Sequence, residues 1–398
     1  MTHDKRNSRF NRRDSLKLGG AAMVIGAAGL IPGSRAWAFS DKAKERDVSD
    51  FDMTGGYDPA HEYLMATAHE NPKMRDSVSM WISDDQGRFG FPRMTIEAIS
   101  GEWNNRGLEA NIAWPDGRVL IGAGGFPGAA PVMIDGKAMT INAGPLTYEL
   151  IEPLRRWNMR FDGDAYAATV QDQMQGVKTG PLRKVLITVE AIMAVPPWSP
   201  GEQARDEATA KAVGAVGGHR HEQLFRCKGS FAVEGEATQD FTGTGLFVRR
   251  TGARDVGDFP GHCWQSAVFP SGKAFGLLAF PPRNDGTPAY GEGFLFDGKV
   301  KTYAKVIEAP WMTRFVPHDA PVDVVLGTPD GKQVRISGRT HDSTYIVKGN
   351  PMFGNWDSFV QEPNVKLPFH QGGARYEWDG EVAYGMIERS LPADKVSY

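Results

Sequence analysis

The sequence has few cysteines and no long apolar run, and both absences narrow its class. Cys227 and Cys263 are its two cysteines and no Cys-x-x-Cys pair occurs, so a structural zinc or a redox centre is not indicated. No stretch beyond the N-terminus approaches ~18 consecutive apolar residues, so we expect no integral membrane segment in the mature chain. Both cysteines lie in strand-like segments, as a disulfide pair or as two small buried apolar side chains.

Several motifs that mark common chemistries are also missing. There is no Gly-x-Ser-x-Gly nucleophile elbow and no phosphate-binding Gly-x-x-x-x-Gly-Lys, and no dinucleotide fingerprint follows a strand and opens a helix. The net charge of -3 comes without a basic cluster, which argues against nucleic acid as a partner. We therefore expect no cofactor, no nucleic-acid partner, and neither serine-hydrolase nor nucleotide chemistry.

The N-terminus has the three parts of an export signal rather than of a disordered basic tail. Arg12-Arg13 precedes a glycine-rich apolar run from Leu18 to Ile31, which is followed by the cleavage site Ala36-Trp37-Ala38. The run is too short to cross ~30 Å of hydrocarbon. Paired arginines with weak hydrophobicity favour the twin-arginine route. We expect residues 1–38 to be a twin-arginine signal peptide that the export machinery binds, and the mature protein to be periplasmic or secreted.

Most of the remaining chain alternates apolar and polar residues with a period of two. Strand-like segments are separated by turn pairs such as Ser271-Gly272, Asp297-Gly298, Asp330-Gly331 and Asp379-Gly380. About nineteen such segments are too many for one small barrel of ~8 strands. The pattern predicts an all-β protein with two antiparallel β-barrel or sandwich domains and a few short helices.

The composition also predicts where these domains begin and end. Residues 39–73 are expected to form a polar leader and a short helix, with Asp58 as N-cap and Pro59 at the first helical position. The first β domain is expected to span residues 74–200, and the second to span residues 221–398. The alanine- and charge-rich residues 201–220 between them predict a helical or mobile connection.

Several short stretches from about residue 75 to residue 390 carry a family resemblance. They are His221-Glu222-Gln223, Gly229, Gly243-Thr244-Gly245, Gly252-Ala253-Arg254-Asp255, Pro115-Asp116-Gly117-Arg118-Val119, Tyr148, Glu152-Pro153-Leu154-Arg155-Arg156-Trp157 and Tyr384-Gly385-Met386-Ile387-Glu388-Arg389. The chain resembles a family of tandem lipocalin-like proteins similar to carotenoid 1,2-hydratase (hydroxyneurosporene synthase) and AttH-type proteins. The resemblance implies two lipocalin-like domains and an apolar cavity inside or between them. The family usually carries Arg-Asp-His-Ser-Trp where this chain has Phe247-Val248-Arg249-Arg250-Thr251, so the roles of that histidine and aspartate are not carried over.

Two glutamates are the leading candidates for acid–base catalysis. Glu222 shares a strand face with Leu224, and Glu388 shares one with Tyr384 and Met386. If the face of Glu222 is interior, its carboxyl group beside apolar side chains has a raised pKa and can act as a general acid. The face of Glu388 looks half-buried, where an acid needs a partner, and an acid at the base of an apolar pocket suits protonation of an alkene or loss of water from an alcohol. For Glu222 an ion pair with an arginine, or a solvated position at a strand edge, is the alternative. The family resemblance also marks Glu388 as a motif position.

Three further residues complete the predicted catalytic set. Arg254 and Asp255 follow a glycine turn, where they form either a structural ion pair or an acid oriented by the arginine. His262 is either a proton relay or an interior histidine held by a backbone carbonyl. The residues expected to contact the ligand are Trp264, Tyr384 and Met386.

Two other histidine motifs are weaker candidates. The spacing of His219-Arg220-His221 puts two imidazoles on one strand face, but no third histidine or cysteine is close in sequence, so we expect no metal. His341-Asp342 suggests an acid–base pair. Adjacent residues in a strand point to opposite faces, however, which argues against it.

These residues favour a cofactor-independent lyase or isomerase. It is expected to add or remove water, or to isomerise, a hydrophobic terpenoid, steroid or aromatic small molecule. Glu388 and Glu222 exchange protons with the substrate in this hypothesis, supported by Asp255, Arg254 and His262. The alternative is a non-catalytic periplasmic lipocalin-like carrier of a hydrophobic ligand, which the altered segment Phe247-Val248-Arg249-Arg250-Thr251 favours.

Overall fold

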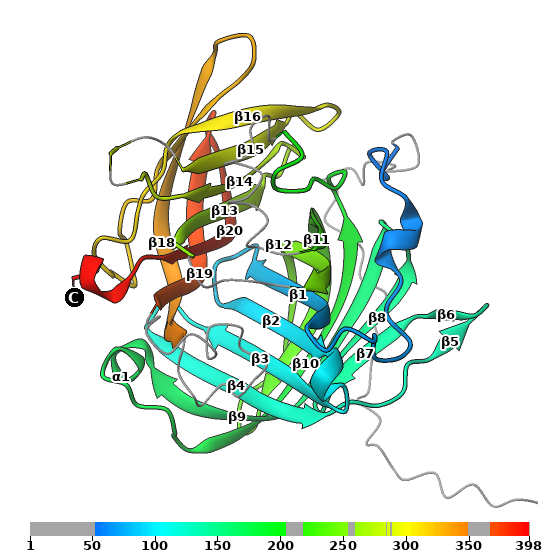
Figure 1. The fold of residues 1–398 in the computed structure, drawn as a ribbon. Helices are drawn as coiled ribbons and strands as arrows, with labels where there is room; N and C mark the ends of the chain where they lie inside the picture. Colours follow the sequence, from blue (N-terminus) through cyan, green and yellow to red (C-terminus); the bar gives the residue numbers. More distant parts are fainter. Residues whose placement is uncertain are drawn as a thin grey trace, which may run out of the picture. The chain divides into compact units, whose positions relative to one another are not determined.

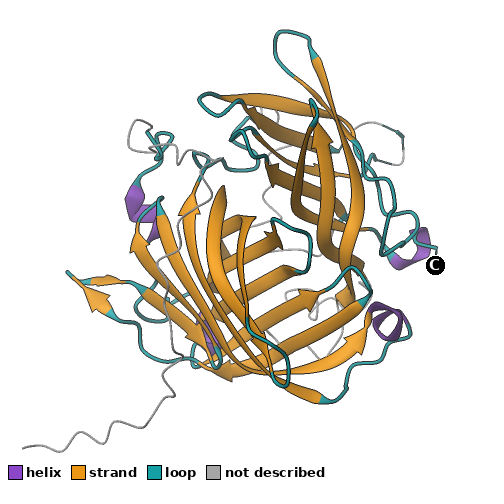
Figure 2. Cartoon of the chain, turned by 180° about the vertical axis from the view of Figure 1, so that it is seen from behind, coloured by secondary structure: helices purple, strands orange, loops and turns teal. Residues whose placement is uncertain are grey.

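The computed structural model describes residues 52–203, 218–253, 259–283, 285–286, 289–348 and 367–397. The predicted signal peptide, most of the predicted connection at 201–220, Arg254 and Asp255 lie outside these residues. The described chain is mostly strand, and its few helices are short (Figure 2). They are η2 (Pro59–Glu62), η3 (Ser100–Glu102), α1 (Val170–Met174) and η5 (Ala393–Lys395). The all-β prediction is confirmed.

The helix predicted at Asp58-Pro59 is present as the 3-10 helix η2. The Asp58 side chain accepts a hydrogen bond from the Ala60 backbone N–H at 2.8 Å, as an N-cap does. None of the helices in the described part of the chain has the length and hydrophobicity of a membrane span.

Ten strands from the first two-thirds of the described chain form one antiparallel sheet. In spatial order they are β10 (Leu182–Met193), β11 (His219–Val233), β12 (Gln239–Ala253), β1 (Met74–Asp84), β2 (Gly90–Ile99), β3 (Asn105–Ala113), β4 (Arg118–Pro127), β9 (Arg156–Thr169), β8 (Leu146–Glu152) and β7 (Thr140–Ala143). Because β10 also pairs with β9, the order of strands returns on itself (Figure 1). Two short strands, β5 (Met133–Ile134) and β6 (Lys137–Ala138), form a separate hairpin.

The next eight strands close into an antiparallel barrel. They are β13 (His262–Val268), β14 (Ala274–Phe280), β15 (Tyr290–Phe296), β16 (Lys301–Glu308), β17 (Val324–Gly327), β18 (Gln333–Lys348), β19 (Leu367–Trp378) and β20 (Glu381–Ser390). Apart from the pair β13 and β20 that closes the barrel, neighbouring strands are consecutive in sequence. The predicted turns are present, and the glycines with positive φ in them are Gly272, Gly298, Gly331 and Gly380.

The pairing of β11 and β12 places the boundary between the sheet and the barrel after β12, and not at residues 201–220 as predicted. β12 pairs with β1 along its length, from Met74 opposite Ala253 to Asp84 opposite Gly243, and β11 pairs with β10. Both strands therefore belong to the large sheet, although the sequence placed them in a second domain beginning at residue 221. Alternation identifies a strand but does not specify its partners, so the boundary at 201–220 had no support from pairing.

Gly243 and Gly245 let β12 approach β1 closely. A Cβ at Gly243 would collide with the carbonyl oxygen of Ser83, and a Cβ at Gly245 with the carbonyl oxygen of Trp81. Both glycines belong to the Gly-Thr-Gly stretch that carries the family resemblance. The close approach of the two strands explains why glycine is needed there.

Three apolar clusters fill and join these units. The cluster inside the large sheet includes Met80, Ile96, Leu108, Phe161 and Phe225. The cluster inside the barrel includes Phe269, Phe275, Leu277, Val324 and Tyr376. The third joins Trp81, Leu224 and Leu246 of the sheet to Trp264, Leu278 and Met386 of the barrel. Strand alternation puts Trp264 and Met386 on the face toward the sheet, whereas Cys263 and Ile387 face the barrel interior. We call the region between the two units, around this third cluster, the junction.

Candidate functional site

Three of the predicted catalytic residues meet at the junction. In the register of β13 and β20, His262 is opposite Ser390 and Trp264 is opposite Glu388. His262 and Glu388 are each only 3% exposed. Glu222 reaches the same region from β11, and its Oε2 accepts a hydrogen bond from the Trp264 indole N–H at 3.0 Å. Residues far apart in the sequence therefore come together where the sheet and the barrel touch.

The Glu388 carboxylate is surrounded by donors and positive charges. Its Oε1 lies 3.1 Å from Nε2 of His262. Its Oε2 accepts from the side-chain amide of Gln371 at 3.1 Å and lies 3.4 Å from Nη1 of Arg93. Burial opposes ionisation, but the His262 hydrogen bond and the charges of Arg93, His262 and Lys348 outweigh it and lower the pKa of Glu388 to about 2. Glu388 is thus a carboxylate at neutral pH, which does not fit the proton-donating role that the sequence suggested for it.

The His262 ring is held on both of its nitrogens. Nε2 bonds Glu388, and Nδ1 lies 2.6 Å from the hydroxyl oxygen of Ser390. The rings of Phe259 and Phe369 pack against it, with centroids at 5.5 and 5.2 Å. The carboxylate, imidazole and hydroxyl form a hydrogen-bonded chain along which a proton can move. From the sequence, one alternative for His262 was an interior histidine held by a backbone carbonyl. In the structure, the side chains of Glu388 and Ser390 hold it instead.

Arg93 connects Glu388 to a second buried carboxylate, that of Glu109 on β3. Nε of Arg93 lies 3.3 Å from Oε2 of Glu109, and Nζ of Lys348 lies 2.7 Å from the same oxygen. Burial disfavours the charged form of Glu109, but the charges of Lys348 and Arg93 outweigh it and lower the pKa. Two cations therefore hold two carboxylates in their ionised forms at the junction.

Two amide side chains connect the same carboxylates across the junction. Asn111 donates through Nδ2 to Oε1 of Glu109 at 3.1 Å and to Oε1 of Gln371 at 2.8 Å. Gln371 in turn donates to Glu388. Asn111 is on β3 of the sheet and Gln371 on β19 of the barrel, so this chain of hydrogen bonds spans both units. Oδ1 of Asn111 is buried and has no hydrogen-bond partner among the described residues.

Glu222 lies in a cluster with a different charge balance. Nη2 of Arg220 is 2.5 Å from its Oε1, and the Trp264 indole binds its Oε2. Burial raises the pKa of Glu222, and the charge of Arg220 and the hydrogen bond from Trp264 offset this only in part. Glu222 therefore holds a proton more readily than Glu388 does.

A ladder of aromatic and guanidinium groups runs between these two clusters. The Arg220 guanidinium lies 4.7 Å from the ring centroid of Trp264, and Trp264 meets Trp81 edge-on at 4.8 Å. Arg93 lies 5.4 Å from the Trp81 ring. Such contacts are attractive because of the ring quadrupole. The two carboxyl groups with opposite pKa shifts consequently lie at opposite ends of one packed series of side chains.

The three predicted ligand contacts occupy two different places. Trp264 and Met386 belong to the apolar cluster of the junction. Tyr384 lies away from them, where its ring is 4.7 Å from the ring of His341 and leaves no room for a Cβ at Gly87. The structure therefore separates Tyr384 from the other two.

A β-bulge alters the geometry of His341-Asp342. The register of β18 and β19 shifts between Thr340 and Asp342. Nε2 of His341 lies 2.7 Å from the Gly87 carbonyl oxygen. The Asp342 carboxylate fills the space where a Cβ of Gly90 would stand. Both side chains thus contact the hairpin between β1 and β2, contrary to the opposite faces that simple alternation predicts. Burial raises the pKa of Asp342 to about 7.

A third histidine, His61, lies beside His219 and His221. It is far from them in the sequence, so the sequence did not indicate that the three side chains are close. The ring of His61 lies 4.0 Å from that of His219, and Nε2 of His221 lies 2.8 Å from Oε1 of Glu62. Burial and the two neighbouring histidines lower the pKa of His219 to about 4. Within the described residues, no set of three or more His, Cys, Asp or Glu side chains has the arrangement of a metal site.

Cys227 and Cys263 are two separate free thiols, and both are buried. Of the two alternatives raised by the sequence, the structure therefore has the small buried side chains and not the disulfide.

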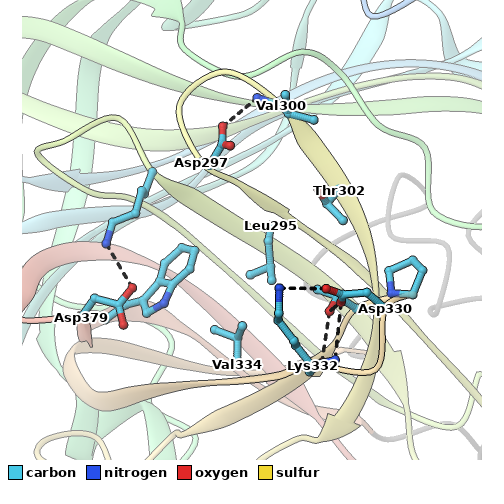
Figure 3. Close-up of a pocket in the computed structure, with 12 residues that line it drawn as sticks. Leu295, Asp297, Val300, Thr302, Asp330, Lys332, Val334 and Asp379 are labelled. Carbon is cyan, nitrogen blue, oxygen red and sulfur yellow. Dashed lines mark hydrogen bonds and ion pairs between the residues drawn. The ribbon is translucent and has the colours of Figure 1, made fainter.

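A cavity of about 530 Å³ lies at one end of the barrel, away from these clusters (Figure 3). Its lining includes Leu295, Val334 and Trp378, together with Lys273 and Lys332. None of the described residues predicted for catalysis or ligand contact lines it. The candidate acids lie instead outside the barrel, packed between its wall and the sheet.

Sequence reasoning missed much of the hydrogen-bonded and charged network at the junction. The residues that it did not single out are Arg93, Glu109, Asn111, Lys348, Gln371 and Ser390. Glu109 and Asn111 alternate with apolar neighbours along β3, as residues on a solvated strand face do, and this disguised them. Their closeness to Glu388 depends on the docking of the barrel, which no local pattern indicates.

The sequence matches the family model described as Domain of unknown function (DUF7064) over residues 58–393. No curated protein matches it. Solved structures with a similar fold include an AttH-type protein from Nitrosomonas europaea, with 13% identity and a TM-score of 0.48 over 82% of this chain and 94% of that chain. The crystal structure of CghA with Sch210972 is 10% identical in sequence, with a TM-score of 0.49 over 83% of this chain and 97% of that chain. Kievitone hydratase from Nectria haematococca has 9% identity and a TM-score of 0.39 over 84% and 94%.

Proposed function

The chain belongs to the family described as Domain of unknown function (DUF7064), and from the charges at its own junction we propose a cofactor-independent lyase or isomerase. The observation that carries the proposal is the contrast between two buried carboxyl groups. Burial raises the pKa of Glu222, whereas His262 and Arg93 overcome burial and lower the pKa of Glu388 to about 2. Two titratable groups whose pKa values are driven apart suit the roles of acid and base.

The proposed reaction moves two protons and one molecule of water. For the removal of water, Glu388 takes a proton from the carbon next to the alcohol carbon. Glu222 gives its proton to the hydroxyl group, water leaves and a carbon–carbon double bond forms. For the addition of water these steps run in reverse. For an isomerisation, Glu388 takes a proton from one carbon, Glu222 gives a proton to another, and no water is gained or lost. His262 and Ser390 can share the proton that Glu388 gains, because the three groups are hydrogen-bonded in series.

The proposed substrate is a hydrophobic terpenoid, steroid or aromatic small molecule. The apolar side chains of the junction, including Trp81, Trp264 and Met386, would surround it. The candidate acids are at most 3% exposed, so the proposal requires the barrel and the sheet to separate locally while substrate enters. The unpartnered Oδ1 of Asn111 would then be available to a hydroxyl group of the substrate.

Turnover by matched variants tests this proposal. The purified protein is incubated with terpenoid, steroid and aromatic alcohols and alkenes in H₂¹⁸O, and products that differ by one water are followed by mass spectrometry. We expect Glu388→Gln and Glu222→Gln to lose roughly 10²- to 10⁴-fold in rate, the usual contribution of a positioned acid or base. Glu308→Gln removes an exposed carboxylate that pairs with Arg335 and should have no effect. Equal rates in all four proteins would reject the acid–base assignment.

A non-catalytic carrier is the second candidate, favoured by one observation. The cavity at the barrel end is open to a ligand although none of the described candidate acids lines it. Saturable binding of a compound from the same panel, without turnover by the wild-type protein, would support the carrier and contradict the enzyme.

We also propose that the protein acts outside the cytoplasm. The proposal rests on Arg12-Arg13 and the apolar run that follows it. Replacing both arginines by lysine should leave the full-length precursor in the cytoplasm, as cell fractionation would show. Unchanged export of that variant would reject the twin-arginine route.

A further inference from the structure

The cavity at the end of the barrel has the size and lining of a ligand site that is separate from the junction. It lies where the β13–β14, β15–β16, β17–β18 and β19–β20 turns meet, because an up-and-down barrel brings alternate turns to one end. Its volume of about 530 Å³ falls within the roughly 300–1,000 Å³ typical of small-molecule sites. Leu295 and Val334 lie at its centre, with Asp297, Asp330 and Asp379 around them (Figure 3).

The floor of this cavity is the uncovered end of the barrel core. Leu295 belongs to the apolar cluster of the barrel, and Val334 and Trp378 pack against that cluster. Val300, on the turn between β15 and β16, is 60% exposed at the cavity rim. Together with Leu295 and Val334, Val300 gives the cavity an apolar lining that can contact a ligand.

Trp378 is fixed in place by its neighbours. Its ring meets Phe269 edge-on at 5.7 Å, and Nζ of Lys273 lies 4.9 Å from the ring centroid. Lys273 is itself bound by Glu381 at 3.0 Å and by Asp379 at 3.4 Å. The indole is therefore rigid, and a second ring can pack against the part of it that Lys273 leaves uncovered.

The charges around the cavity are already compensated. Lys332 pairs with Asp330 at 2.9 Å, and Lys273 pairs with Glu381 and Asp379. Oδ1 of Asp297 accepts the backbone N–H groups of Lys299 and Val300, each at 2.7 Å. A charged ligand would have to compete with these partners, whereas a hydroxyl group can join them as an additional donor or acceptor.

We infer that this end of the barrel binds a neutral aromatic ring that carries a hydroxyl group, stacked on Trp378 over Leu295 and Val334. The site is distinct from the proposed catalytic junction and does not depend on it. Aspartate oxygens and the hydroxyl of Thr302 at the rim receive the hydroxyl group of the ligand. The apolar floor favours an aromatic ring over a sugar ring, which exposes hydroxyl groups around its whole edge.

Titration calorimetry with 2-naphthol as the probe tests this inference. We expect saturable binding that weakens at least tenfold in Trp378→Leu, which removes the stacking surface. Val300→Arg changes an exposed residue and should weaken binding similarly by placing a charge at the rim, without disturbing the core. Trp103→Leu replaces a tryptophan of the large sheet and should bind as the wild type does.

Three results would overturn the inference. They are absence of saturable 2-naphthol binding, equal binding by the wild type and by both Trp378→Leu and Val300→Arg, and tighter binding of methyl glucoside or of 2-naphthalenesulfonate than of 2-naphthol. The glucoside result would indicate a sugar site, and the sulfonate result an anion site. None of these measurements uses turnover. The inferred binding site can therefore be rejected while the proposed function stands, and the proposed function can be rejected while the binding site stands.

Discussion

Replacing Glu388 with glutamine removes one charge from the junction and keeps the shape of the side chain. The pKa of Glu388 is about 2, against 4.5 for an unperturbed glutamate. At about 1.36 kcal/mol per pKa unit, ionisation of Glu388 among its partners, net of the cost of burial, contributes about 3 kcal/mol to the free energy of unfolding at neutral pH. Arg93 and His262 lose a charged partner in the variant, so we expect a loss of that size.

The pH dependence of this loss identifies its origin. A carboxylate whose pKa is lowered in the folded state stabilises the protein above its unfolded pKa, and the stabilisation disappears as the pH falls through the folded pKa. The difference between wild type and Glu388→Gln should therefore be complete above about pH 5.5 and should shrink between pH 4.5 and pH 2, where the wild-type side chain also becomes neutral.

Thermal denaturation followed by tryptophan fluorescence measures the effect. With an unfolding entropy of about 2.1 cal/mol/K per residue over residues 58–393, a loss of about 3 kcal/mol lowers Tm by ~4 °C at pH 7. The matched control Glu308→Gln should stay within about 1 °C, since exposed ion pairs contribute about 0–1 kcal/mol. A Tm for Glu388→Gln equal to that of the wild type at pH 7, or a difference that persists unchanged at pH 3, would refute the reasoning.

Three further predictions concern stability and thiol chemistry. Lys348→Met leaves the Glu109 carboxylate without its nearest cation and should cost about 3–5 kcal/mol in denaturant titration, part of which the added change Glu109→Gln should restore; no restoration would contradict the pairing. Burial raises the pKa of Asp342 to about 7 from 3.8, so stability is lost as the pH rises from about 4 to 7. Asp342→Asn should thus match the wild type near pH 4 and exceed it by up to about 4 kcal/mol at pH 8, and equal unfolding midpoints at pH 8 would be the contrary result. Burial raises the pKa of the Cys227 and Cys263 thiols, so Ellman's reagent should react with neither in the native protein and with both in denaturant; no reaction in denaturant would contradict the two free thiols.

The sequence was most informative where the structure depends on near neighbours. The all-β fold follows from period-two alternation, and the four barrel turns follow from Ser-Gly and Asp-Gly pairs whose glycines can take positive φ. The face of each strand was also predictable, because the side-chain period is two whatever the strand pairs with. Glu388 and Met386 indeed share the face that packs toward the sheet.

Partner choice is what the sequence could not supply. The carboxylate of Glu388 bonds Arg93, which is 295 residues away, and His262, which is 126 residues away. Alternation indicated that the strand face of Glu388 is half-buried but not that cations surround its carboxylate, so the sequence suggested a proton donor where the structure has an ionised carboxylate. Similarly, β11 and β12 look like the first strands of a second domain until their pairing with β10 and β1 is known. The bulge at Asp342 misled in another way, because one extra residue locally cancels the alternation rule.

The pairing of β1 with β12 also bears on the order in which this chain can fold during synthesis. The two strands are separated by roughly 170 residues, and closing a loop of that length costs about 4–5 kcal/mol of chain entropy. Until Ala253 has left the ribosome, the hydrogen-bonding groups on one edge of Met74–Asp84 have no strand to pair with. Any fragment that stops before β12 therefore exposes an open sheet edge, and a gene split between the apparent halves of the sequence should give an aggregating N-terminal product and no independent domain.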